Sequence, residues 1–108
     1  MENMNMNSIL GKIEMIKRQL KNLQEELAET TVKGNDDGEI VTAIVSGTGK
    51  LLDYQLNFEA FGTINQEDLR RALIQATNNG LQQAKQLEIT RKKEIVGEVN
   101  LPDIPGLF

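Results

Sequence analysis

Basic side chains are the strongest candidates for a binding site in this 108-residue chain, and they gather in three groups. The groups are Arg91-Lys92-Lys93, then Lys17, Arg18 and Lys21, and finally Arg70-Arg71. Lysine and arginine bind phosphate oxygens, and such contacts position a protein on nucleic acid without reading its bases. No aromatic residues interleave with these groups, which argues against stacking on single-stranded bases. Each group could instead be an ordinary solvated helix face, or a complement to the dipole at a helix C-terminus.

Other reactive arrangements are missing from the sequence. The chain contains no His, Cys or Trp, so it lacks the commonest metal ligands, the thiolate nucleophile and the histidine base. Gly47-Thr48-Gly49-Lys50 resembles part of a phosphate-binding loop, but Leu51 follows where that motif requires Ser or Thr and a helix. Asp36 and Asp37 lack the spacing of a calcium loop. We therefore expect no enzymatic activity, no cofactor, no metal and no small-molecule substrate.

The overall charge is acidic, with 12 Lys and Arg against 16 Asp and Glu and a net charge of −4. Taken over the whole chain, this balance argues mildly against binding to nucleic acid. Charges in solution are screened over ~8 Å at physiological salt, however, so a basic cluster at one end can act independently. No apolar run approaches the ~18 residues of a membrane span, and residues 1–7 lack the apolar core of a signal peptide. We therefore expect a cytoplasmic protein.

A regular apolar stripe predicts the first helix, from about Ser8 to Ala28, with Asn7 or Ser8 as its N-cap. Its residues recur at spacings of 4-3-4-3-4, namely Ile9, Ile13, Ile16, Leu20, Leu23 and Leu27. Such a helix needs a surface on which to bury this stripe. A coiled coil with a second copy is one possibility, although the stripe spans fewer than three heptads. Packing on the chain's own sheet is the other.

Two alternating segments predict strands after the β-branched stretch 29–33 and the polar turn 34–38. The first covers 39–47, where Val41, Ala43 and Val45 alternate with Thr42, Ile44 and Ser46. The second covers 50–58, with a buried face of Leu52, Tyr54, Leu56 and Phe58. Gly47-Thr48-Gly49 supplies the positive φ of a short hairpin loop. A three-stranded antiparallel meander follows from this order.

A long helix is predicted from the N-cap Asn65 to about Val96, after a loop over 59–65. Small residues at every fourth position, Ala72, Ala76, Gly80 and Ala84, indicate close packing and favour a helix that continues through Asn78-Asn79-Gly80. Pro102 and Pro105 predict an extended tail, whose Leu101, Ile104, Leu107 and Phe108 would dock on apolar surface. The prediction is one α+β domain over residues 9–97, a flexible segment 1–8 and a tail 98–108.

The ordered set of elements resembles the YbaB/EbfC family of bacterial nucleoid-associated proteins over nearly the whole chain. The resemblance rests on Gln24 to Leu27 at the end of the first helix, Thr31 to Gly34, the strand from Gly38 to Gly47, Gly49, Ala76 to Asn79 and Leu107-Phe108. Asn57-Phe58 stands where many members carry Asp-Pro. The family has homodimers whose sheets join and whose helices project, and its members bind double-stranded DNA with little sequence preference.

The resemblance implies a homodimer with Leu52, Tyr54 and Leu56 near the shared core. It also implies a nucleoid protein of the bacterial cytoplasm that organises the chromosome and influences gene expression. DNA would lie between projecting helical ends, where Arg91, Lys92 and Lys93 are the first candidates and Lys17, Arg18 and Lys21 the second. The alternative is a chaperone-like or adaptor module that binds proteins, although the unequal helix lengths, roughly 20 and 30 residues by periodicity, disfavour a closed antiparallel pair.

Overall fold

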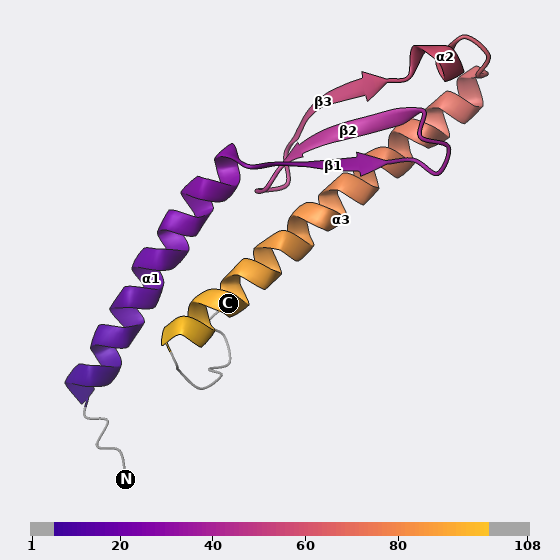
Figure 1. Cartoon of the computed structure of the whole chain (residues 1–108). Coiled ribbons are helices and arrows are strands. Elements are labelled where there is room, and N and C mark those ends of the chain that lie inside the picture. Colours follow the sequence, from indigo (N-terminus) through magenta and orange to yellow (C-terminus); the bar gives the residue numbers. More distant parts are fainter. Residues whose placement is uncertain (1–5, 100–108) are drawn as a thin grey trace.

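A computed structural model of the protein describes residues 6–99, which form an elongated body of 68 × 21 × 17 Å (Figure 1). Its elements are α1 (Met6–Glu29), β1 (Thr31–Asn35), β2 (Val41–Ser46), β3 (Leu51–Leu56), α2 (Phe58–Phe61) and α3 (Gln66–Val99). The predicted α+β order of a helix, a three-stranded antiparallel sheet and a long helix is confirmed. The predicted tail lies outside the described residues, apart from the end of α3.

The sheet has the strand order β1-β2-β3, and both pairings are antiparallel. The central strand β2 shows the predicted alternation, and the structure buries Val41, Ala43 and Val45 completely. The hairpin between β2 and β3 also forms as expected, with Gly49 at a φ of 89°. A strand rather than a helix follows Lys50, so a phosphate-binding loop is excluded here.

Small residues let α3 lie directly against one face of the sheet. Ala72, Ala76 and Ala84 pack with the buried residues of β2. Where α3 crosses β1, the backbones of Gly34 and Gly80 meet, and a Cβ placed on Gly34 would overlap the Gly80 nitrogen. Because the approach is this close, neither position has room for a side chain. The helix is continuous through Asn78-Asn79-Gly80, as the ridge of small residues predicted.

The apolar stripe of α1 packs on the distal half of α3, which differs from both predicted partners. Ile16, Leu23 and Leu27 are buried in one cluster with Ile95 of α3, flanked by Leu20 and Leu87. The unequal lengths do not prevent antiparallel pairing, because α3 has 34 residues and uses its first half to cover the sheet (Figure 1). Helix α1 begins at Met6, earlier than the predicted cap.

The third strand corrects the predicted alternation. A register shift opposite Ile44 and Val45 makes β3 irregular near Leu51, and Leu52 is 51% exposed. Tyr54 and Leu56 pack against the core. Phe58, predicted at the end of the strand, instead begins α2 and is 82% exposed. The strand ends at Leu56 because the Asn57 side chain accepts a hydrogen bond from the Glu59 N–H and caps this short helix.

The two edges of the sheet differ in how they are closed. Side-chain amides of α3 cover the β1 side: Asn79 Oδ1 accepts the Asn35 N–H at 3.1 Å, and Gln75 Oε1 accepts the Asp37 N–H at 2.9 Å. On the other side β3 is an edge strand, joined to α3 by the Tyr54 hydroxyl and Thr77 Oγ1 at 2.7 Å. Within residues 6–99 no further strand pairs with β3, whereas α3 takes the Asn35 N–H of β1 and the Asp37 N–H of the turn that follows it.

The glycine contact predicts a strong effect of one methyl group. Gly34→Ala should lower the free energy of unfolding by about 1–3 kcal/mol, because the added Cβ forces α3 away from the sheet. Gly11→Ala is the matched control, since nothing lies near its Cβ and alanine favours a helix by up to ~1 kcal/mol. Urea unfolding at one protein concentration compares the two variants. Equal stability of both variants would contradict the close approach of α3.

Candidate nucleic-acid interface

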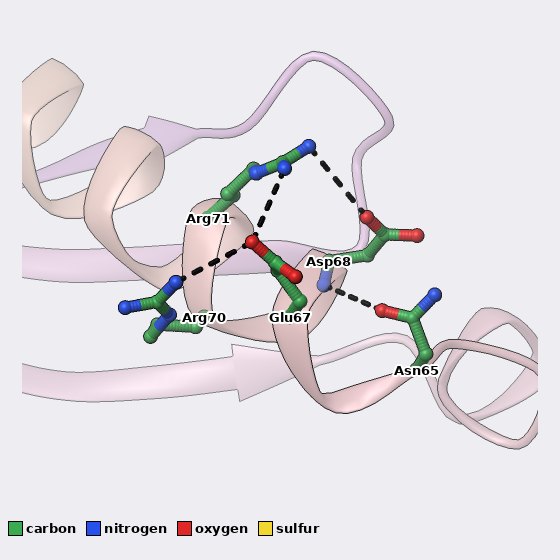
Figure 2. A network of polar contacts seen from close by, with 5 residues as sticks. All are labelled: Asn65, Glu67, Asp68, Arg70 and Arg71. Atoms are coloured by element: carbon green, nitrogen blue, oxygen red, sulfur yellow. Dashed lines mark hydrogen bonds and ion pairs between the residues drawn. The ribbon is translucent and has the colours of Figure 1, made fainter.

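Arg70 and Arg71 lie in the first turns of α3, where carboxylates neutralise them (Figure 2). Glu67 Oε1 lies 3.6 Å from Arg70 Nη2 and 3.3 Å from Arg71 Nη2, and Asp68 Oδ1 lies 3.9 Å from Arg71 Nη1. The Asp68 N–H donates to Asn65 Oδ1 at 2.7 Å, so the predicted cap is confirmed and fixes this turn. This basic group is balanced by its own helix and offers little net charge to a phosphate.

Most of the densest basic group is also paired with carboxylates. Arg91 Nη2 lies 2.9 Å from Glu26 Oε2 of α1, and Arg91 Nε lies 3.9 Å from Glu94 Oε2. Lys92 Nζ lies 3.7 Å from Glu88 Oε2. Lys93 is exposed and forms no ion pair with any described residue. Of the three candidates predicted first, only Lys93 therefore presents an uncompensated charge.

The basic segment of α1, residues 12–24, differs from the two basic groups of α3 because its cations are not paired with carboxylates in the part of the chain that the structure describes. It contains four cations, Lys12, Lys17, Arg18 and Lys21, and a single carboxylate, Glu14. Within residues 6–99 none of these four cations forms an ion pair, and Lys17, Arg18 and Lys21 are exposed. Lys17 and Lys21 lie one turn apart on one flank of the helix. The structure thus gives the second predicted group the larger uncompensated charge.

Lys12 belongs to the same basic segment, and sequence reasoning missed it because it stands apart from the other cations. A count of the carboxylates three or four positions from each cation would have found Lys12, because it has none at these spacings and its nearest carboxylate is Glu14. The same count would have set aside Arg70 and Arg71. It would not have revealed the pairing of Arg91 with Glu26, which lie on different helices.

Acidic residues gather at the other end of the molecule. Residues 29–59, which include the sheet, carry six carboxylates and two lysines. One of these carboxylates has a structural role: Asp36 is buried and accepts hydrogen bonds from the N–H groups of Gly38, Ile40 and Val41. The others are exposed: Glu29 ends α1, and Asp37, Glu39, Asp53 and Glu59 belong to the sheet, its turns and α2. The chain is therefore acidic on average and basic at the distal part of α1.

The residues predicted for a dimer core, Leu52, Tyr54 and Leu56, lie together on the open strand β3. Two further apolar residues are exposed: Phe58 on α2, and Ile74, which is 55% exposed and lies one turn of α3 before Thr77, the partner of Tyr54. Sequence reasoning missed Ile74 because its neighbours in the helix suggested only a buried ridge. These residues leave an apolar surface at this edge of the molecule.

A groove of about 380 Å³ lies between α1 and α3. Leu23 and Ile95 line it, as do the side chains of Glu26, Arg91 and Gln19. The Gln19 Oε1 atom is buried there without a hydrogen-bond partner. Across the described part of the chain, His, Cys, Asp and Glu form no cluster suited to a metal ion. None of the helices in residues 6–99 is long and apolar enough to cross a membrane.

Known proteins resemble this chain in sequence and in fold. A nucleoid-associated protein of Caldanaerobacter subterraneus is 30% identical over 104 residues, which cover 96% of this chain and 91% of that relative. A nucleoid-associated protein of Streptomyces avermitilis is 32% identical over 104 residues, covering 94% and 92%. The crystal structure of an uncharacterized protein from Helicobacter pylori shares the fold, with a TM-score of 0.71 at 20% identity, covering 88% of this chain and 100% of that one. Residues 1–99 match the YbaB/EbfC DNA-binding family, and the chain therefore belongs to that family, as its sequence pattern predicted.

Proposed function

We propose that this protein binds double-stranded DNA through its backbone phosphates, with little sequence preference, and helps to organise the bacterial chromosome in the nucleoid. The observation that carries the proposal is the basic segment of α1, whose four cations form no ion pair with described residues. Cations of this kind gain from contact with phosphate because bound counterions are released. They read no base edges, so the contact depends little on sequence. Through such contacts the protein would influence gene expression.

The names of the relatives support the same assignment. The relatives from Caldanaerobacter and Streptomyces are named nucleoid-associated proteins, and we extend that location to this chain. The proposed site differs from the one favoured by the sequence, because Arg91 and Lys92 are engaged by carboxylates. We therefore place the main phosphate contacts on Lys17, Arg18 and Lys21, with Lys12 on the other flank of α1 and Lys93 on α3 as further cations that form no ion pair with described residues.

We also propose that the working form is a homodimer joined through β3. The support is the asymmetry of the sheet: α3 amides occupy the β1 side, whereas β3 is an open edge. Exposed edge strands invite pairing with another chain. Leu52, Phe58 and Ile74 surround this edge with exposed apolar surface, which a second copy would bury. Joined in this way, two copies would project two basic segments.

An adaptor that binds proteins is the second candidate, and exposed apolar residues of α1 favour it. Met6, Leu10 and Met15 are exposed on the same helix as the cations. A protein partner could cover them. Capture from lysate before and after nuclease digestion separates the two functions, because partners held only through DNA disappear on digestion.

Neutral substitutions on α1 test DNA binding. Lys17→Gln with Lys21→Gln should weaken binding to a random duplex, because two phosphates are then no longer neutralised. The slope of log K against log salt should fall in magnitude by about 1.8, or about 0.9 for each of these phosphates. Fluorescence anisotropy at several salt concentrations measures both the affinity and the slope.

Arg70→Gln with Arg71→Gln is the control, since it removes the same charge from residues already paired with Glu67 and Asp68. We expect a much smaller change in affinity and slope. Equal reductions in the two double variants, or no binding by the unaltered protein at low salt, would refute the proposed interface.

A charged residue on β3 tests the dimer. Leu52→Lys should shift the protein toward monomer, because the lysine would lie in the joint core, where burying an unpaired charge is costly. Leu10→Lys is matched in residue type and exposure, 50% against 51%, and lies on α1 away from that edge. Light scattering at micromolar concentration should report a dimer for the unaltered protein and the Leu10 variant. A monomer in all three samples, or a dimer in all three, would reject assembly through β3.

A further inference from the structure

One ion pair links the two long helices. Between α1 and α3, the pair of Glu26 and Arg91 is the only ion pair among the described residues. Every other ion pair in this part of the chain joins residues three or four positions apart on α3. The side chains of Arg91 and Glu26 are 37% and 52% exposed. The pair therefore lies within reach of a ligand arriving from solvent.

The contact uses the chemistry by which arginine binds phosphate. A guanidinium presents planar, directed donors that fit carboxylate and phosphate oxygens alike. At 2.9 Å, Glu26 Oε2 takes the Arg91 Nη2 donor, while Glu94 approaches Nε at 3.9 Å. Both carboxylates line the groove between the helices together with Arg91. A DNA phosphate that approaches this guanidinium would compete with Glu26 for the Nη2 donor and would be repelled by the charges of both carboxylates.

We propose that Arg91 is a phosphate-binding residue masked by Glu26, so that this ion pair limits how tightly the protein holds DNA. The inference rests on the proposed function and identifies an ion pair that limits the DNA affinity of the same interface. Lys12, Gln19 and Glu26 follow one another at seven-residue intervals, which places them along one flank of α1, whereas Lys17 and Lys21 lie on the other. Release of Arg91 would thus add a phosphate contact on the flank of Lys12.

Replacement of Glu26 by a phosphate as the partner of Arg91 should leave α1 packed on α3. Ion pairs between exposed side chains contribute little to stability. The helices are held instead by Ile16, Leu23, Leu27 and Ile95, which are buried. Removing the Glu26 charge should therefore free the guanidinium without separating α1 from α3.

Two neighbouring glutamates provide the test. Glu26→Gln and Glu25→Gln remove the same charge from adjacent positions, but only Glu26 pairs with Arg91, and Glu25 forms no ion pair with a described residue. We expect Glu26→Gln to bind a random duplex several-fold more tightly than Glu25→Gln, with a salt slope steeper by about 0.9 for the added phosphate contact. Thermal unfolding of both variants should match that of the unaltered protein.

Arg91→Gln completes the design. In the unaltered background it should change DNA affinity little, because Arg91 is already occupied. In the Glu26→Gln background it should return affinity and salt slope to those of Glu25→Gln. Equal binding by the two glutamine variants, with the unaltered protein binding DNA, would overturn this inference and leave the proposed function in place. Absence of DNA binding by the unaltered protein would overturn both.

Discussion

The contact between Gly34 of β1 and Gly80 of α3 is the constraint on which the rest of the structure depends. Because the two backbones meet there, α3 can lie close to the sheet, with Ala72, Ala76 and Ala84 packed on the buried residues of β2. The Gly80 position is also tight, since a Cβ there would lie 2.7 Å from Val45 Cγ2. The first half of α3 is thereby fixed to the sheet, and its direction determines where the second half projects.

The projecting half of α3 supplies the surface on which α1 folds. Most of the stability of a helix in a protein comes from packing of its apolar face, so α1 depends on burial of its stripe. Ile95 and Leu87 provide the opposing apolar surface, and α1 runs alongside the second half of α3, antiparallel to it, from the far end of the molecule to the sheet (Figure 1). At about 1.5 Å per residue, Lys21 lies about 12 Å along α1 from Glu29 at its end, and Lys12 about 26 Å, so screening weakens the repulsion between the basic segment and the sheet most strongly at its distal end. A net charge of −4 is therefore compatible with a locally positive surface.

Much of the fold could be predicted from the sequence because its signals are local. Periodicity identified the two long helices, α1 and α3, and the strand β2. The ridge of small residues indicated that α3 continues past Asn79. The partner of α1 could not be predicted, because an apolar stripe indicates burial without saying against what. The irregular start of β3 and the helix at Phe58 were missed because both depend on local geometry that alternation does not encode.

The candidate site was predictable only in part, because one of its ion pairs joins residues that are far apart in the sequence. Arg70 and Arg71 pair with residues within one turn, which spacing alone can reveal. Arg91 pairs across helices with Glu26, and no local pattern reports that contact. The basic groups thus look alike in the sequence and differ in the charge that they present. What separates them is the position of nearby carboxylates, which only the fold supplies.

The central claim is that DNA contacts the basic segment of α1 and avoids the acidic sheet end. Backbone amide shifts in ¹H–¹⁵N correlation spectra, followed while a short duplex is added, test it most directly. The account predicts the largest shifts over residues 12–24 of α1, with little change in the turn between β1 and β2. Shifts concentrated on the strands and their turns, with α1 unaffected, would contradict it.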